Sequence, residues 1–229
     1  MAKSAASEGM DRLQKKLSAF MKERNFRVRG RTYNRRTLDG LTQVINFQMG
    51  QFDPPGTVHI PWLRENYYGQ FTMNVGVFVP EVHMVEFGGK ELKFIAEYNC
   101  CVRERLGMLA PERADTWWSI QGDDKRSQSL VNELLRRLDR DAFPFLALFE
   151  TRDALLGEVL KPSRESPLLR NRGRVICAII LAARGQLKDA RDLLVAHRED
   201  HIQERGYPGH LKYLKELAVK LGIEGFEAS

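Results

Sequence analysis

The spacing of apolar residues changes twice along the chain, and these changes limit the folds that are open to it. Through residue 24, apolar side chains recur every three or four positions, as at Met10, Leu13 and Leu17, which is the period of a helix with one buried face. From there to about residue 122 the period is two, as in half-buried strands. The helical period then returns and continues to the end of the sequence. One helix, then strands with no helix between them, then helices predicts an α+β fold with an antiparallel sheet.

The predicted sheet has about five strands and belongs to the first of two predicted domains. The strands span Arg27–Arg35, Thr42–Met49, Tyr67–Val79, Leu92–Arg105 and Thr116–Ile120, with a long loop over residues 50–66. We expect an α+β domain over residues 1–122 and a helical extension over residues 123–229. Within the extension, "AARGQLKDARDLL" is similar to half of a tetratricopeptide-type hairpin, with Gly185 and Ala190 as its small packing residues.

Positive charge is concentrated at the start of the chain. Residues 1–36 contain eleven Lys and Arg against three acids, a net charge of 11 − 3 = +8. Because the whole chain carries +6, the remaining residues carry 6 − 8 = −2. A local excess of this kind favours contact with an anionic partner at that segment.

Cysteine usage and hydropathy predict the compartment. Three cysteines, two of them adjacent, do not suit a disulfide framework and favour a reducing compartment. Residues 1–9 lack the apolar core of a secretory signal, and the longest apolar run, residues 175–183, is far shorter than the ~20 residues of a membrane span. We therefore expect a cytoplasmic protein without a membrane segment.

Five phrases of the sheet region occur together in one known family. "NFRVRGRTYNR", "VINFQMGQF", "FTMNVGVF", "CVRERLG" and "DTWW" follow one another in this order. Together they resemble the bacterial family called domain of unknown function 4304, over about residues 8–122. The resemblance implies a small α+β domain without an assigned reaction, and it supplies no catalytic residues.

The arginine-rich run "RNFRVRGRTYNRR" is the first candidate site. On one strand, alternate side chains share a face, so the pattern predicts a stripe formed by Arg27, Arg29, Arg31, Tyr33 and Arg35. Such a stripe could grip the phosphates of a nucleic acid, with the tyrosine stacked on a base. The alternative is that the charges protect the margin of the sheet from pairing with another sheet.

Polar residues on the central strands form the second candidate site. By alternation, one face of the sheet should carry Asn46, Gln48, Thr72 and Asn74, with Arg103 and Arg105 as a charged lip. This surface could bind a ligand or a protein partner. The alternative is a set of cross-strand hydrogen bonds that only stabilise the sheet, which is the better interpretation if Asn74 is buried.

Other motifs give weaker indications. Trp117 and Trp118 should point to opposite faces of a strand, one into the core and one available as a protein-binding anchor. His197 and His201 have metal-compatible spacing, and His210 could add a third ligand, but they fit the edge of a helix packing face better, so we expect no metal. The sequence contains no phosphate loop, dinucleotide fingerprint or nucleophile elbow, and we expect no cofactor.

These observations favour a non-catalytic bacterial protein that binds another protein through the sheet face and the helical extension. A role in defence or toxin immunity is a further hypothesis, drawn only from the frequency of small orphan domains in those systems. The first alternative is a nucleic-acid-binding accessory protein that uses the arginine stripe. The second is an enzyme with a small polar pocket joining Asn46, Asn74 and Arg103.

Overall fold

The computed structural model describes residues 5–50, 67–89, 91–120, 124–161, 167–204 and 206–226. It divides into two compact units. Unit 1 comprises residues 1–36, 42–77 and 94–147, and unit 2 comprises residues 37–41, 78–93 and 148–229. The predicted loop over residues 51–66 and the predicted domain boundary between residues 122 and 123 lie outside the described residues.

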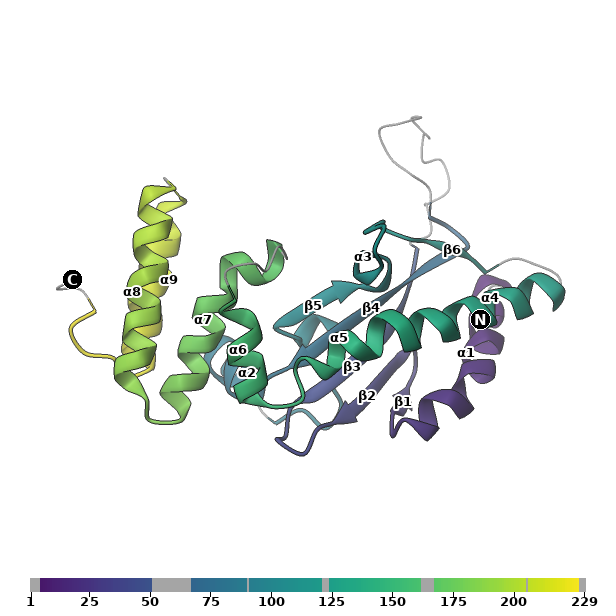
Figure 1. The fold of residues 1–229 in the computed structure, drawn as a ribbon, viewed down its shortest axis with the longest axis horizontal. Helices are drawn as coiled ribbons and strands as arrows, with labels where there is room; N and C mark the ends of the chain where they lie inside the picture. Colours follow the sequence, from purple (N-terminus) through teal and green to yellow (C-terminus); the bar gives the residue numbers. More distant parts are fainter. Residues whose placement is uncertain are drawn as a thin grey trace. The chain divides into compact units, whose positions relative to one another are not determined.

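Unit 1 is an antiparallel sheet with helices packed on it, as the periodicity predicts (Figure 1). Its strands follow the order β1-β2-β3-β4-β5, and β6 also pairs with β4. The strands are β1 (Arg27–Arg29), β2 (Thr32–Arg36), β3 (Thr42–Met49), β4 (Gln70–Phe78), β5 (Val102–Arg105) and β6 (Trp118–Ser119). The helical elements are α1 (Ala5–Glu23), the 3-10 turn η1 (Glu97–Asn99), α3 (Leu106–Leu109), α4 (Asp124–Arg137), the π-helical turn η2 (Leu138–Ala142) and α5 (Phe143–Ala147).

One face of the sheet forms the core of unit 1. It presents Phe47, Phe71, Met73 and Val75, each 3% exposed or less, as the alternation predicts. Helix α1 packs there, and α4, η2 and α5 follow one another as a rod that crosses the strands (Figure 1). The apolar faces of α1 and of the rod therefore cover the apolar side of the sheet. The other side of the sheet is polar.

The prediction of one strand over residues 27–35 is wrong, because the chain turns back within it. Gly30 adopts a left-handed φ of 57°, and β1 pairs antiparallel with β2, so that Arg29 faces Thr32 and Val28 faces Tyr33. Among the described residues, the sheet consequently has six strands. A glycine tolerates this backbone conformation without the steric cost that a Cβ atom brings.

The prediction of a strand from Leu92 to Arg105 holds only for its last four residues. Asn34 binds the backbone of Ile95 on both sides, donating to its carbonyl at 2.9 Å and accepting from its N–H at 2.7 Å. In a strand, the backbone of Ile95 would bond to the backbone of a neighbouring strand, but here it bonds to the side chain of Asn34. The 3-10 turn η1 begins two residues later.

Unit 2 is helical. It contains α2 (Pro80–Phe87), α6 (Arg152–Val159), α7 (Pro167–Ala183), α8 (Leu187–Gln203) and α9 (Pro208–Lys220). Helix α2 falls between two strands, so the expectation of strands without intervening helices is wrong. Gly185 has a φ of 77° and separates α7 from α8, and Ala190 is fully buried, which confirms the predicted helix–turn–helix.

Candidate functional site

The predicted polar residues do lie together on the face of the sheet opposite α1. Asn74 Nδ2 donates to Gln48 Oε1 at 2.9 Å, and Asn46 Nδ2 donates to Thr32 Oγ1 at 2.8 Å. Thr72 Oγ1 donates to the carbonyl of Thr116 at 3.0 Å. These bonds use much of the polar capacity of the side chains inside the sheet.

Asn74 decides between the two interpretations of this face. It is only 6% exposed and is hydrogen-bonded, and Thr72 is fully buried and hydrogen-bonded. Buried polar groups that pair with each other stabilise the sheet. The geometry therefore favours a structural role for Thr72 and Asn74, whereas Gln48 is exposed and Asn46 is half-buried.

Both arginines of the predicted lip lie on this face, because Arg103 faces Gly76 and Arg105 faces Asn74 in the sheet register. Arg103 binds Glu97 through two hydrogen bonds, of 2.7 and 3.0 Å, and these raise the pKa of Arg103. Arg105 forms an ion pair with Asp115. The lip is thus already neutralised by acids of the same unit.

An aromatic cluster borders the face at β6. Trp118 is 6% exposed and packs against Phe71 in the core, whereas Trp117 is half-buried and points to the opposite side, as alternation predicts. The ring of Trp117 stacks on Tyr67 at a centroid distance of 4.1 Å, and the guanidinium of Arg105 lies 5.4 Å from the Trp117 ring. We call Tyr67, Arg105, Asp115 and Trp117 the aromatic rim.

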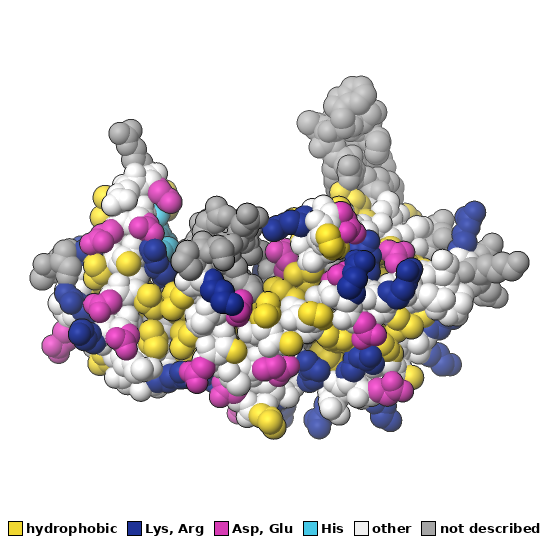
Figure 2. Space-filling model, viewed as in Figure 1, with side chains coloured by type: hydrophobic (Ala, Val, Ile, Leu, Met, Phe, Trp, Pro, Cys, Tyr) yellow, Lys and Arg dark blue, Asp and Glu magenta, His cyan; other side chains and the backbone are white. Residues whose placement is uncertain are grey.

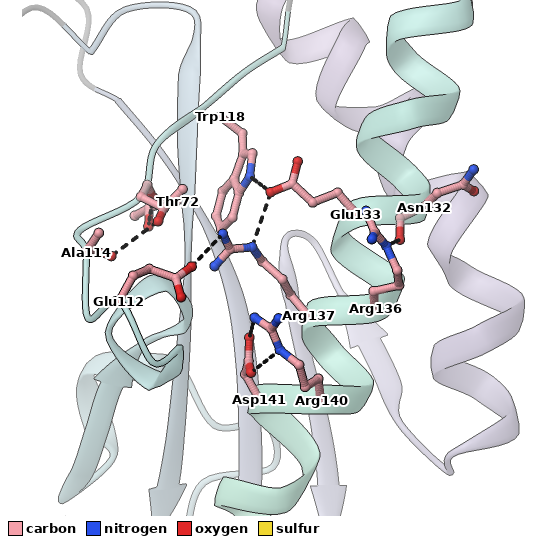
Figure 3. Close-up of polar contacts among 11 residues, drawn as sticks. Thr72, Glu112, Ala114, Trp118, Asn132, Glu133, Arg136, Arg137, Arg140 and Asp141 are labelled. Atoms are coloured by element: carbon pink, nitrogen blue, oxygen red, sulfur yellow. Dashed lines mark hydrogen bonds and ion pairs between the residues drawn. The ribbon is translucent and has the colours of Figure 1, made fainter.

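A polar network on the core side holds the backbone that carries the aromatic rim (Figure 3). Trp118 Nε1 donates to Glu133 of α4 at 3.0 Å. Arg137, one turn further along α4, donates to Glu133 and to Glu112, each at 3.2 Å. These contacts fix residues 112–118 against α4, so the position of Trp117 depends on the core side as well.

Glycine at position 107 allows this segment to approach closely. A Cβ atom there would lie 2.2 Å from the carbonyl oxygen of Ala114 and 2.8 Å from the backbone nitrogen of Thr116. Both contacts are with backbone atoms, which cannot move aside as a flexible side chain can. Sequence reasoning singled out neither Tyr67 nor Asp115, although the adjacent "YY" and "DTWW" were available as signals.

The structure separates the members of the predicted arginine stripe. Arg27 and Arg29 face Asn34 and Thr32, so they lie on the polar face. Tyr33 is 1% exposed on the core face, where burial raises its pKa. Arg31 donates to Ser7 at 3.0 Å, and Arg35 donates to Gln43 at 2.8 Å. The prediction of a single face is wrong because the hairpin at Gly30 changes the alternation, and the buried tyrosine has no exposed ring to offer a base.

The edge of the sheet fits the alternative interpretation of these arginines. Strand β1 is the edge strand, has three residues, and is exposed throughout. Short, charged edge strands discourage pairing with a second sheet. Binding of nucleic acid by the arginines stays a prediction, now without the single-stripe geometry.

Three histidines of unit 2 gather where α8 meets α9. His197 Nε2 lies 2.9 Å from His210 Nε2, and the rings of His201 and His210 are 4.6 Å apart. Histidine side chains reach the surface beside these helices (cyan, Figure 2). Within the described ranges, no group of three or more His, Cys, Asp or Glu side chains is arranged to hold a metal ion.

This histidine cluster should make the folded protein less stable as the pH decreases. Burial, with nearby His210 and Arg174, lowers the pKa of His197 to about 4, and burial with His201 and Arg172 lowers the pKa of His210. A lowered pKa means that the fold favours the neutral ring. The stabilisation is therefore complete above pH 6.5 and is lost as the pH falls toward about 4.

We expect His197→Gln to flatten this pH dependence. Between pH 7 and pH 5 the wild type should lose about 1 kcal/mol more than the variant, a figure halved to allow for the partial exposure of the ring. Urea unfolding followed by circular dichroism at both pH values measures the difference. Equal losses in the two proteins would contradict the expectation.

Two of the three thiols, those of Cys100 and Cys177, are not activated as nucleophiles. Burial raises the pKa of Cys177 to about 12 and raises the pKa of Cys100 well above the ordinary value. A thiol with a raised pKa is mostly protonated near neutral pH and reacts slowly.

No helix in the described part of the chain is both long and apolar enough to cross a bilayer.

Comparison with known proteins adds one match. A family model described as "Domain of unknown function (DUF4304)" matches residues 17–148. The match includes the whole sheet, the aromatic rim and the rod formed by α4, η2 and α5. No curated protein and no solved structure matches the chain.

Proposed function

The chain belongs to the DUF4304 family, and from that premise we propose that it is a non-catalytic interaction module that binds another protein through the aromatic rim. The observation that carries the proposal is the position of Trp117, half-exposed and stacked on Tyr67 beside Arg105. Trp, Tyr and Arg are the residues that most often dominate the binding energy of protein interfaces.

The construction of the rim supports this function. Trp117 and Tyr67 are held by their mutual stacking, and the segment that carries Trp117 is fixed by Trp118, Glu133 and Arg137. A preorganised aromatic anchor loses little conformational entropy on binding. The amides of the neighbouring strands are paired with each other, which suits a supporting surface better than the reacting groups of an enzyme.

We also propose a cellular setting. Three free thiols suit a reducing compartment, so we place the protein in the bacterial cytoplasm. A toxin or a phage-defence component is one kind of partner that would fit such a module.

Site-specific photo-crosslinking tests the proposal. A photo-reactive residue at Gln48, exposed on the polar face, should capture a partner in cells of the source organism, whereas one at Lys15 on α1 should not. The captured protein is then purified and titrated calorimetrically against the wild type and Trp117→Ala. We expect the variant to bind at least tenfold more weakly.

A matched control removes an exposed aromatic side chain elsewhere. Phe87 of α2 is 64% exposed and belongs to unit 2, so Phe87→Ala should leave the affinity unchanged. The proposal fails if no protein is captured specifically from position 48, or if Trp117→Ala binds the captured protein as tightly as the wild type.

A further inference from the structure

Two arginines of β1 carry positive charge on the polar face that the described residues do not neutralise. Arg27 and Arg29 are both exposed on β1, and the described residues provide neither of them with a hydrogen bond or an ion pair. Arg103 and Arg105, on the same face, are neutralised by Glu97 and Asp115. The uncompensated arginine charge of this face therefore lies on β1 and on Arg36, at the end of the neighbouring strand β2.

A straight row of residues connects this edge to the aromatic rim. Arg29 faces Thr32, Thr32 faces Asn46, and Asn74 faces Arg105. Gly50 N–H donates to the carbonyl of Gln70 at 2.9 Å, so Gly50 of the chain after β3 faces Gln70 of β4. Because the strands are antiparallel, four residues back from Gly50 and four forward from Gln70 place Asn46 opposite Asn74. Four spacings of ~4.8 Å between strands make the row about 19 Å long.

The two ends of this row differ in chemistry. One end offers a stacked tryptophan and tyrosine beside a neutralised arginine, and the other offers two free guanidinium groups. Between them, Asn46 and Gln48 keep polar atoms at the surface, because Asn46 uses its Nδ2 and Gln48 its Oε1 in the bonds described above. Such atoms can hydrogen-bond the backbone of an extended chain.

We propose that the partner presents an extended acidic segment, which runs across the sheet from the aromatic rim to Arg27 and Arg29. This inference rests on the proposed function, because it assumes that the partner is a protein anchored at Trp117. At ~3.3 Å per residue, about six residues of an extended peptide cover the row. Its carboxylates pair with the two free arginines, where each guanidinium can bind a carboxylate through two hydrogen bonds.

A peptide suits this face better than a nucleic acid does. Sequence-tolerant binding of single strands relies on rings that stack on successive bases along a basic groove. Tyr33 is buried on the other face, and the row between Arg29 and Arg105 contains no aromatic side chain. The rings of Tyr67 and Trp117 stack on each other at one end only.

The test uses two charge-matched probes and the full-length protein. One is a fluorescein-labelled octaglutamate peptide, and the other is a labelled oligothymidylate of nine nucleotides, which carries eight phosphates. Binding is followed by fluorescence anisotropy at 20 and 200 mM NaCl. We expect octaglutamate to bind the wild type at low salt, and to bind Arg27→Glu/Arg29→Glu at least tenfold more weakly.

A control variant separates this surface from general charge. Arg12→Glu/Lys15→Glu makes the same change in net charge on α1, whose residues pack on the core face, and should change the octaglutamate affinity less than threefold. Circular dichroism confirms that each variant is folded.

The outcomes distinguish this inference from the proposed function. Octaglutamate that does not bind, or that both double variants weaken equally, overturns the acidic segment, even if the captured partner still depends on Trp117. Oligothymidylate that binds tenfold more tightly than octaglutamate, and is lost in Arg27→Glu/Arg29→Glu, replaces it with nucleic-acid binding. Octaglutamate binding that follows the expected pattern supports the acidic segment, even if crosslinking from position 48 captures no partner.

Discussion

Replacing Arg152 with methionine should destabilise unit 2 by about 3 kcal/mol. Arg152 joins three segments of that unit that are far apart in the sequence, because it begins α6 and binds residues 39 and 81. Its guanidinium forms a two-bonded ion pair with Glu81 of α2 and also donates to the carbonyl of Asp39. Its side chain is 18% exposed and that of Glu81 is 15% exposed.

The cost arises from the partners that remain. Methionine fills a similar volume but leaves the Glu81 carboxylate largely buried without its counter-charge, which is the expensive way to break a buried ion pair. The bond from Arg152 N–H to Asp39 Oδ2, at 2.6 Å, survives because it belongs to the backbone. That bond is also the main reason why the pKa of Asp39 is lowered.

Two spectroscopic probes localise the effect. Trp117 and Trp118 lie in unit 1, so their fluorescence reports that unit, whereas circular dichroism at 222 nm reports the helices of both units. Arg184→Met is the control, because Arg184 pairs with the 81%-exposed Asp153, also in unit 2, and should cost less than 0.5 kcal/mol. Equal urea midpoints for the two variants would refute the assignment. Adding Glu81→Gln to Arg152→Met should restore part of the loss.

Local periodicity was sufficient to predict the succession of helix, sheet and helices. It also predicted that Trp117 and Trp118 point to opposite sides with one of them in the core, because alternation along a strand needs no knowledge of the partner strand, and the structure shows that Trp118 is the buried one. The same alternation placed Asn46, Gln48 and Asn74 on one face, and the bond between Asn74 and Gln48 confirms that placement for two of them.

Errors occurred where a distant residue or a turn overrides the local pattern. Gly30 interrupts the arginine run, but its left-handed φ became evident only from the pairing of β1 with β2. Asn34 holds Ile95, 61 positions away, and nothing in the local sequence of either residue indicates the other. The stacking of Tyr67 on Trp117 likewise depends on the pairing of β4 with β6, which brings together residues 50 positions apart.

Helix α2 shows a different kind of error. Pro80 at its first turn and Gly88 at its end, with a φ of 59°, are the ordinary signals that start and stop a helix. The helix has eight residues and no amphipathic stripe, so periodicity gave no reason to separate it from the strand before it. For short elements, capping residues carry more information than the period does.

Replacing Gln43 with leucine should destabilise unit 1 by about 2 to 3 kcal/mol. Gln43 is a fully buried amide on the core face of β3, two positions before the fully buried Ile45 on the same face. Its Oε1 accepts from Arg35 at 2.8 Å, and its Nε2 donates to the carbonyl of Leu146 at 2.9 Å. Helix α5 ends at Ala147, so this carbonyl is one of the last four, which have no partner within the helix.

Leucine matches the volume of glutamine but removes both bonds, leaving a buried carbonyl without its donor and the Arg35 guanidinium without this acceptor. The free energy lost with these hydrogen bonds exceeds the free energy gained by burying an apolar side chain, because the former partners stay buried without a bond. Tryptophan fluorescence during urea unfolding measures it, since Trp117 and Trp118 lie in unit 1. Gln128→Leu is the control: Gln128 is exposed on α4 and bonds only to Asn132 among described residues, so its loss should stay within 0.5 kcal/mol. If Gln43→Leu unfolds at the same urea concentration as Gln128→Leu, then the bonds of Gln43 to Arg35 and Leu146 do not stabilise unit 1.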